Sequence, residues 1–287
     1  MTTIQNLIDL RAEKEFFIGI DSDGCVFDSM ELKHKECFCP AFVNSFNLQS
    51  VSKYAREAWE FVNLYSRDRG ANRFLTALKA LDILRERAEV KKRGVKIIEL
   101  PALKACTEKE INLNNPALKA ELDKTGDPEL KLVYQWSLDV NEAVAKISRG
   151  MRPFPLFYEC LEKMSSKADL VAVSHAPAEA LLQEWAEPGI DKKMRAIAGQ
   201  ETGTKSECLS SAAKGKYPQD KILMIGDAPG DLRAANSINA LFYPIIPGKE
   251  DDSWNRFLNE AMEKFFSLNF RGTYQKILLS EFWKALK

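Results

Sequence analysis

This chain of 287 residues has few histidines, no excess of either charge and no long apolar run. Two histidines in the whole sequence, and six cysteines without paired zinc-type spacing, disfavour a zinc site. No segment approaches the ~20 apolar residues of a membrane span, and residues 1–11 show no leader signature. We therefore expect a cytoplasmic protein in which Cys37 and Cys39 are structural rather than a redox or metal pair.

The charges of the chain balance, since Lys plus Arg (41) equals Asp plus Glu (41). The chain thus has no broad positive field that would attract nucleic acid or an anionic membrane. We expect neither as a partner, and we look for ligand recognition in a discrete site instead. At this length the chain suits one large domain, or a core with a smaller second domain.

The most informative segment is residues 16–24, Phe-Phe-Ile-Gly-Ile-Asp-Ser-Asp-Gly, an apolar run that ends at two carboxylates. Alternate side chains of an extended segment point the same way, so Asp21 and Asp23 can face one pocket at the carboxyl end of a buried strand. Gly24 allows a sharp turn immediately afterwards. Open α/β sheets bind their ligands at such strand ends.

Two further apolar runs end in polar residues. Residues 222–226 precede Asp227, and residues 170–173 precede Ser174, while Lys205 opens a predicted helix between them. The ammonium of Lys205 and the hydroxyl of Ser174, next to backbone amides, are together suited to bind a phosphate group. In chain order, the polar residues that follow the first motif are Ser174, Lys205, Asp227 and Asp231.

The rest of the chain divides by pattern. Residues 29–149 carry Leu, Ala, Lys, Arg and Glu at helical spacing without a clear strand, which predicts an inserted helical domain. After the Pro and Gly cluster at 150–155, strands and helices alternate, which is typical of a parallel sheet with helices on both faces. Residues 251–287 indicate two more helices, whose aromatic side chains pack on the core or form a dimer interface.

The carboxylates of the two motifs raise an electrostatic problem. Each pair of carboxylates at about 4 Å costs roughly 4 kcal/mol at an effective dielectric constant of 20. A bound cation resolves the repulsion among Asp21, Asp23, Asp227 and Asp231. Hard oxygen ligands and a need for open coordination positions favour Mg²⁺, which often shares its coordination with a substrate phosphate.

The order Asp-x-Asp, Ser, Lys and Asp-x-x-x-Asp, each in its strand or helix context, resembles the haloacid dehalogenase (HAD) superfamily. The resemblance covers about residues 14–30 and 150–248. It implies an α/β fold with a Rossmann-like parallel-sheet core, formed by 1–28 and 150–250, and an α-helical cap inserted at 29–149. Residues 251–287 lie outside the resemblance, and we expect them to form a helical extension packed on the core.

The resemblance also implies the roles of individual residues. Asp21 would be the nucleophile that forms an aspartyl-phosphate, and Asp23 would be the acid and then the base. Ser174 would bind the phosphoryl group, and Lys205 would orient Asp21 and neutralise charge. The second carboxylate, Asp23, is typical of the phosphatases and phosphomutases of the superfamily.

The same resemblance implies a Mg²⁺ site. The Asp21 carboxylate, the backbone carbonyl of Asp23 and Asp227 would hold the ion, and Asp231 would support it directly or through water. Cys25 departs from the Thr or Val that commonly follows the glycine, and we expect this departure to change local packing more than mechanism.

Two other residues are candidate substrate contacts. His175 follows Ser174, although a loop histidine with ordinary hydrogen bonds is an equal alternative. Arg69 lies in a run of three arginines between 67 and 73, where it can recognise an anionic group of the substrate. The alternative for this run is a solvated helix start.

The sequence therefore predicts a Mg²⁺-dependent phosphatase that acts on a small phosphorylated metabolite, as a monomer or homodimer. A sugar phosphomutase, similar to β-phosphoglucomutase, would use the same core residues. A non-catalytic phosphate-ligand sensor or scaffold is the alternative from another class, and the intact carboxylates and Lys205 argue against it.

Overall fold

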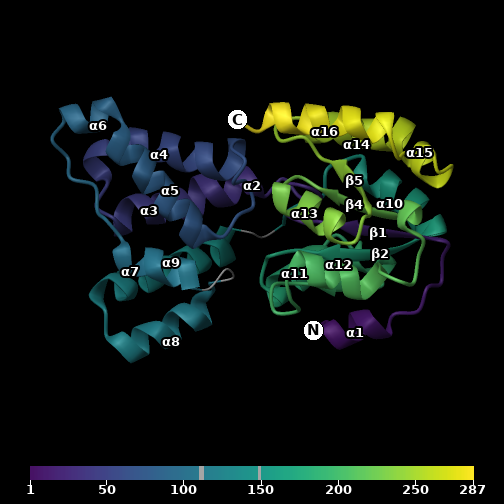
Figure 1. Cartoon of the computed structure of the whole chain (residues 1–287), viewed down its shortest axis with the longest axis horizontal. Helices are drawn as coiled ribbons and strands as arrows, with labels where there is room; N and C mark the ends of the chain where they lie inside the picture. The colour runs from purple at the N-terminus through teal and green to yellow at the C-terminus, as the bar shows by residue number, and fades with distance from the viewer. Residues whose placement is uncertain (110–112, 148–149) are drawn as a thin grey trace. The chain divides into compact units, whose positions relative to one another are not determined.

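The computed structural model describes residues 1–109, 113–147 and 150–287, which fall into two compact units (Figure 1). The first unit comprises Met1–Met30 and Arg149–Lys287, and the second comprises Glu31–Ser148. None of the helices in the described ranges is long and apolar enough to cross a bilayer.

The first unit is built on a five-stranded parallel sheet, which confirms the predicted α/β fold. The strand order is β3-β2-β1-β4-β5, so the central β1 pairs with β2 on one side and with β4 on the other. Chain connections therefore run in opposite directions from β1, and such switch points are where α/β sheets place ligands. The strands are β1 (Phe16–Ile20), β2 (Ala168–Val173), β3 (Ala196–Ala198), β4 (Ile222–Gly226) and β5 (Leu241–Pro244).

Both faces of this sheet are covered, because successive side chains of a strand point to opposite sides. Phe16, Ile18 and Ile20 belong to one apolar cluster, and Phe17 belongs to another. The first cluster is completed by α10 (Phe157–Lys167), α11 (Ala178–Ala186), α14 (Glu250–Arg256) and α15 (Met262–Phe266). The second is completed by α1 (Ile4–Asp9), α12 (Lys205–Ala213), α13 (Pro229–Ser237) and the end of α16 (Thr273–Ala285).

The last forty residues contribute directly to the first cluster. Trp254, Phe257, Phe265 and Phe270 are all fully buried in it, and the Trp254 ring meets Phe157 edge-on at 5.1 Å between centroids. Each such side chain contributes about 2 kcal/mol by leaving water. Short helical turns join these elements: η4 (Asp191–Lys193), η5 (Gln219–Lys221) and η6 (Phe257–Ala261).

The second unit has helices and, among its described residues, no strand. Its own apolar core is centred on aromatic side chains, with Trp59 and Trp136 edge-on at 6.0 Å. The helices are α2 (Met30–Leu32), η1 (Lys33–Phe38), α3 (Cys39–Ser45), η2 (Gln49–Val51), α4 (Ser52–Glu60), η3 (Phe61–Tyr65), α5 (Arg73–Glu86), α6 (Ala88–Lys92), α7 (Pro101–Lys109), α8 (Asn115–Thr125) and α9 (Pro128–Ile147). All six cysteines of the chain are free and buried.

Candidate active site

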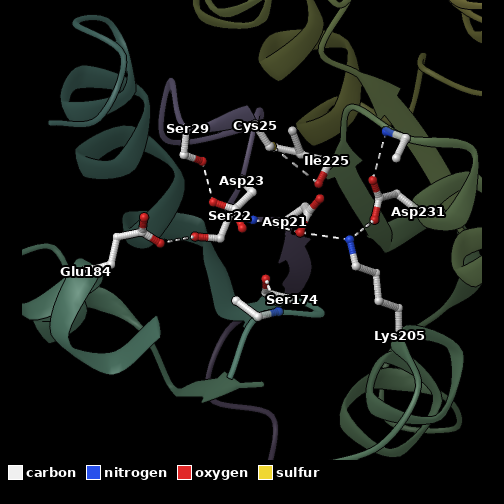
Figure 2. A network of polar contacts seen from close by, with 12 residues as sticks. Asp21, Ser22, Asp23, Cys25, Ser29, Ser174, Glu184, Lys205, Ile225 and Asp231 are labelled. Carbon is white, nitrogen blue, oxygen red and sulfur yellow. Dashed lines mark hydrogen bonds and ion pairs between the residues drawn. The ribbon is translucent and has the colours of Figure 1, made fainter. Parts of the chain in front are cut away.

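The carboxyl ends of β1 and β4 bring three carboxylates together. One oxygen from each of Asp21, Asp227 and Asp231 lies within 4.8 Å of the others, and all three residues are buried. Asp21 follows β1 directly, and its backbone N–H donates to the carbonyl of Ile225 at 3.0 Å, which ties the two strand ends together. Figure 2 shows the Asp21 and Asp231 side chains converging on one centre.

Asp231 reaches this centre from the first turn of α13, where it also caps the helix. Its Oδ2 accepts the backbone N–H of Ala228 at 3.0 Å. Gly226, the last residue of β4, makes room for it, since a Cβ at this position would lie 2.4 Å from Asp231 Cγ. Asp231 therefore caps α13 and also belongs to the acidic cluster.

Lys205 is buried in the same centre and is not a solvated surface lysine. Its Nζ lies 2.8 Å from Asp21 Oδ1 and 2.6 Å from Asp231 Oδ1. It is the first residue of α12, whose start is fixed by reciprocal hydrogen bonds between Thr204 and Glu207. Gly19 in β1 allows the close approach of this helix, because a Cβ there would lie 2.8 Å from Leu209 Cδ1.

The charges in this centre are unequal, because one ammonium faces three carboxylates. Burial and the neighbouring Asp231 and Asp227 raise the pKa of Asp21 well above its usual value, although Lys205 acts in the opposite direction. Burial disfavours the charged form of Lys205, yet the pull of Asp21 and Asp231 raises its pKa overall. The excess negative charge and the hard oxygen donors fit a divalent cation such as Mg²⁺.

Asp23 is half-buried beside the cluster, and its carboxylate is not among the three oxygens that converge. It accepts a short hydrogen bond from the hydroxyl of Ser29 (Figure 2). Gly24 follows with a φ of 73°, and its N–H donates to the carbonyl of Phe27, so the chain turns back at once. The carboxylate is thereby held at the rim of the site.

Ser174 is buried at the end of β2, where its N–H donates to the carbonyl of Ala198 at 2.9 Å. Its Oγ accepts the N–H of Ala176 at 3.1 Å, so the hydroxyl shapes the loop and does not cap α11. Figure 2 shows Ser174 on the side of its strand end that faces Asp21. His175, the next residue, is exposed.

Arg69 belongs to the second unit, unlike the other predicted site residues. It is only 4% exposed, which excludes the solvated helix start as an account of this side chain. Its guanidinium donates to the carbonyl of Leu64 at 2.9 Å. Arg69 thus has a local structural contact in its own unit.

Cys25 is fully buried, and its thiol approaches the carbonyl of Ile225 at 3.7 Å. Burial and the carboxylate of Asp21 raise the pKa of this thiol well above its usual value. The raised pKa favours the neutral thiol, and the side chain lies buried next to the end of β4.

Sequence reasoning missed the residues that surround the first motif. Ser22, between the two carboxylates, is fully buried and hydrogen-bonded to two side chains of α11, those of Glu184 and Trp185. A hydroxyl at the end of an otherwise apolar run was the available signal. Nothing in the linear order pointed to partners more than 160 positions away.

No family model and no curated protein matches this chain. Among solved structures, a predicted phosphoglycolate phosphatase from Haemophilus somnus is similar, with 17% identity over 81% of this chain and 86% of that one, at a TM-score of 0.44. A haloacid dehalogenase-like family hydrolase from Xanthomonas campestris has 10% identity over 82% and 83%, with a TM-score of 0.43. A HAD-superfamily hydrolase of subfamily IA from Geobacter sulfurreducens has 12% identity over 81% and 88%, with a TM-score of 0.39. At these identities and TM-scores, the function of this chain rests on its own site.

Proposed function

We propose that the chain is a Mg²⁺-dependent phosphatase that hydrolyses a small phosphorylated metabolite through an aspartyl-phosphate on Asp21. The observation that carries the proposal is the buried contact of Lys205 with Asp21 and Asp231, next to Asp227. Burying four charged groups is unfavourable unless they are paired or hold an ion. The carboxyl ends of parallel strands are where open α/β sheets bind their ligands, and clustered buried charges there mark a candidate catalytic site.

The three clustered carboxylates supply the ligands that Mg²⁺ prefers. When bound there, the ion would neutralise charge on the substrate phosphate and on the site. Lys205 would add the remaining positive charge, and Ser174 with the loop amides after β2 would donate to phosphoryl oxygens.

The reaction needs two proton movements, and we assign both to Asp23, which follows the nucleophile by two positions in the sequence. An Asp21 oxygen would form a bond to phosphorus as the bond to the leaving oxygen breaks, and Asp23 would give that oxygen its proton. Asp23 would then take a proton from water, whose oxygen attacks the same phosphorus. The bond to Asp21 breaks, inorganic phosphate leaves, and both carboxyl groups return to their first state.

A phosphate-release screen tests this proposal. Phosphorylated sugars, nucleotides, polyols and a generic aryl phosphate would be incubated with the enzyme and Mg²⁺, with Asp21→Asn as the control. Release from one class that is lost in the variant supports the phosphatase. Transfer of the phosphoryl group within a sugar, without release of phosphate, would favour the mutase instead, and silence from both assays would favour the sensor.

We also propose that the enzyme acts in the cytoplasm. Its six buried thiols, none in a disulfide, suit a reducing compartment.

A further inference from the structure

We propose that Trp185 and Trp254 are positioning residues: their indole N–H groups hold the segment from Ser22 to Phe27 and so fix the place of Asp23. The kinetic part of this inference rests on the proposed function. The bracing of the segment can be measured without activity.

The segment after β1 closes on itself through its backbone. The carbonyl of Ser22 accepts the N–H groups of Cys25, Val26 and Phe27 at 3.3, 2.9 and 3.1 Å. All of its residues except Asp23 are buried. Because one carbonyl collects three donors, a displacement of Ser22 would move the whole turn that carries Asp23.

The first indole anchors the start of this turn. Trp185 Nε1 donates to Ser22 Oγ at 2.9 Å, and Ser22 Oγ donates its own hydrogen to Glu184 Oε2 at 3.1 Å. The hydroxyl therefore has one donated and one accepted bond in a place where Ser22 is 0% exposed. The two side chains of α11 therefore fix the orientation of the Ser22 hydroxyl. Ser22 lies between Asp21 and Asp23 in the sequence.

The second indole anchors the middle of the turn. Trp254 Nε1 in α14 donates to the carbonyl of Cys25 at 2.8 Å. Phe157 in α10 packs edge-on against both tryptophans, at 5.1 Å from Trp254 and 6.1 Å from Trp185. The two indoles thus contact the same phenylalanine ring, and they donate to the Ser22 hydroxyl on one side of Asp23 and Gly24 and to the Cys25 carbonyl on the other.

This arrangement separates holding the segment from touching the substrate. Neither indole belongs to the acidic cluster, and each reaches it only through backbone or Ser22. Small displacements of a proton-transfer group lower turnover by up to about a hundredfold. Ser22 also donates its backbone N–H to Asp21 Oδ1 at 2.8 Å, so loss of the first indole N–H should lower kcat through both carboxylates of the motif. Loss of the second, which holds the carbonyl of Cys25, should lower kcat through Asp23.

The experiment uses the full chain with Trp185→Phe and Trp254→Phe, which remove the N–H and keep an aromatic ring. Trp136→Phe is the matched control, because Trp136 is buried in the second unit and its Nε1 has no acceptor among the described residues. Ser22→Ala is a milder variant that removes the first anchor and leaves Trp185 intact. Thermal melting checks that each variant folds.

Two quantities are measured on each variant: hydrogen exchange of the peptide that covers residues 22–27, and kcat and KM for phosphate release. We expect faster exchange and a kcat lowered by about tenfold or more in both indole variants, with KM changed less than about threefold. Trp136→Phe should match the wild type in exchange and in kcat.

Unchanged exchange of residues 22–27 in both indole variants and in Ser22→Ala would overturn the bracing. Faster exchange with unchanged kcat would overturn the positioning of Asp23. If the wild-type protein releases no phosphate from any substrate, the proposed function fails, and the exchange data alone then decide whether the indoles hold the segment.

Discussion

The two units of this chain bury different kinds of group. Among the described residues, the sheet unit buries five charged side chains, namely Asp21, Asp169, Lys205, Asp227 and Asp231. The helical unit buries one charged side chain among its described residues, that of Arg69. Its core consists of aromatic and aliphatic side chains. Apolar packing suffices to hold a helical unit together, whereas the buried charges of the sheet unit require specific partners or a bound ligand.

One buried carboxylate of the sheet unit, Asp169, lies outside the acidic cluster. It lies near the start of β2, and it accepts hydrogen bonds from the hydroxyl of Tyr217 and the backbone of Glu13 and Lys14. Its charge is balanced by Arg195 at 2.6 Å. Asp169 is therefore a buried carboxylate satisfied by structure, whereas Asp21 and Asp231 both contact Lys205 and form one acidic cluster with Asp227.

The largest effect should come from Asp21→Asn. The amide keeps the size of the side chain but cannot attack phosphorus, so kcat should fall by about a thousandfold or more. Thermal stability should not fall, because the change removes a carboxylate whose pKa burial and like charge have raised. Phosphate release and melting temperature measure both, and retained turnover would disprove the assigned nucleophile.

Removal of the metal should be nearly as severe. EDTA should abolish phosphate release, and Mg²⁺ should restore it. In the absence of substrate, saturating Mg²⁺ should raise the melting temperature by about 5 °C, since it binds only the folded chain. Asp227→Asn should remove this shift. A Mg²⁺ shift that survives in the variant would place the ion elsewhere.

Gly226→Ala tests the space that the site requires. The added Cβ would lie 2.4 Å from Asp231 Cγ, so Asp231 must move away from Lys205. We expect kcat to fall by at least about tenfold. Gly230→Ala, whose Cβ would meet Arg233 Nη2 at an ordinary 3.7 Å, is the control and should retain activity. Equal activity of the two variants would contradict the packing argument.

Arg69→Ala asks whether the helical unit contributes to substrate choice. Loss of the buried guanidinium and its bond to Leu64 should cost about 1 to 3 kcal/mol of stability. We further expect a severalfold change in preference among phosphorylated metabolites, with less change for a generic aryl phosphate. A uniform effect on all substrates would assign Arg69 to structure alone.

Asp169→Asn should affect stability and leave chemistry unchanged. Although burial raises the pKa of Asp169, hydrogen bonds from Tyr217 and from two backbone N–H groups, together with Arg195, lower it overall. A carboxyl group with a lowered folded pKa stabilises the fold above its unfolded pKa of about 3.9, and this stabilisation is lost as pH falls through the folded value. The variant should therefore melt lower than the wild type at pH 7, with the gap closing below about pH 4, while kcat is retained.

The parts of the structure that were predictable are those where one local signal dominates. β1 and β4 end where an apolar run meets a carboxylate, and both were expected with these bounds. Residues 170–173 were expected as a strand, but β2 begins earlier, at Ala168, because Asp169 is satisfied by distant partners. The pattern of residues 194–198 predicts an extended segment, and β3 covers the last three of these five residues, Ala196–Ala198.

The types of residue in the candidate site could be predicted from the sequence. The contacts that hold these residues in place were less predictable. Carboxylates after apolar strands identify Asp21 and Asp227 without any tertiary information. The roles of Ser22 and Trp185 depend on contacts across more than 160 positions, which no local pattern encodes. Gly226 was visible as a glycine, but the closeness of Asp231 that requires it was not.

The hydrogen bond from Trp254 Nε1 to the carbonyl of Cys25 joins residues 229 positions apart in the chain. This separation determines when the site can form during synthesis on the ribosome. The strand that carries Asp21 is synthesised well before its partners β2 and β4 and before the indole of α14. Contacts of such long separation form slowly. The nascent chain therefore carries its first carboxylates long before they can be held in place, and the site is completed only once residue 254 has left the exit tunnel.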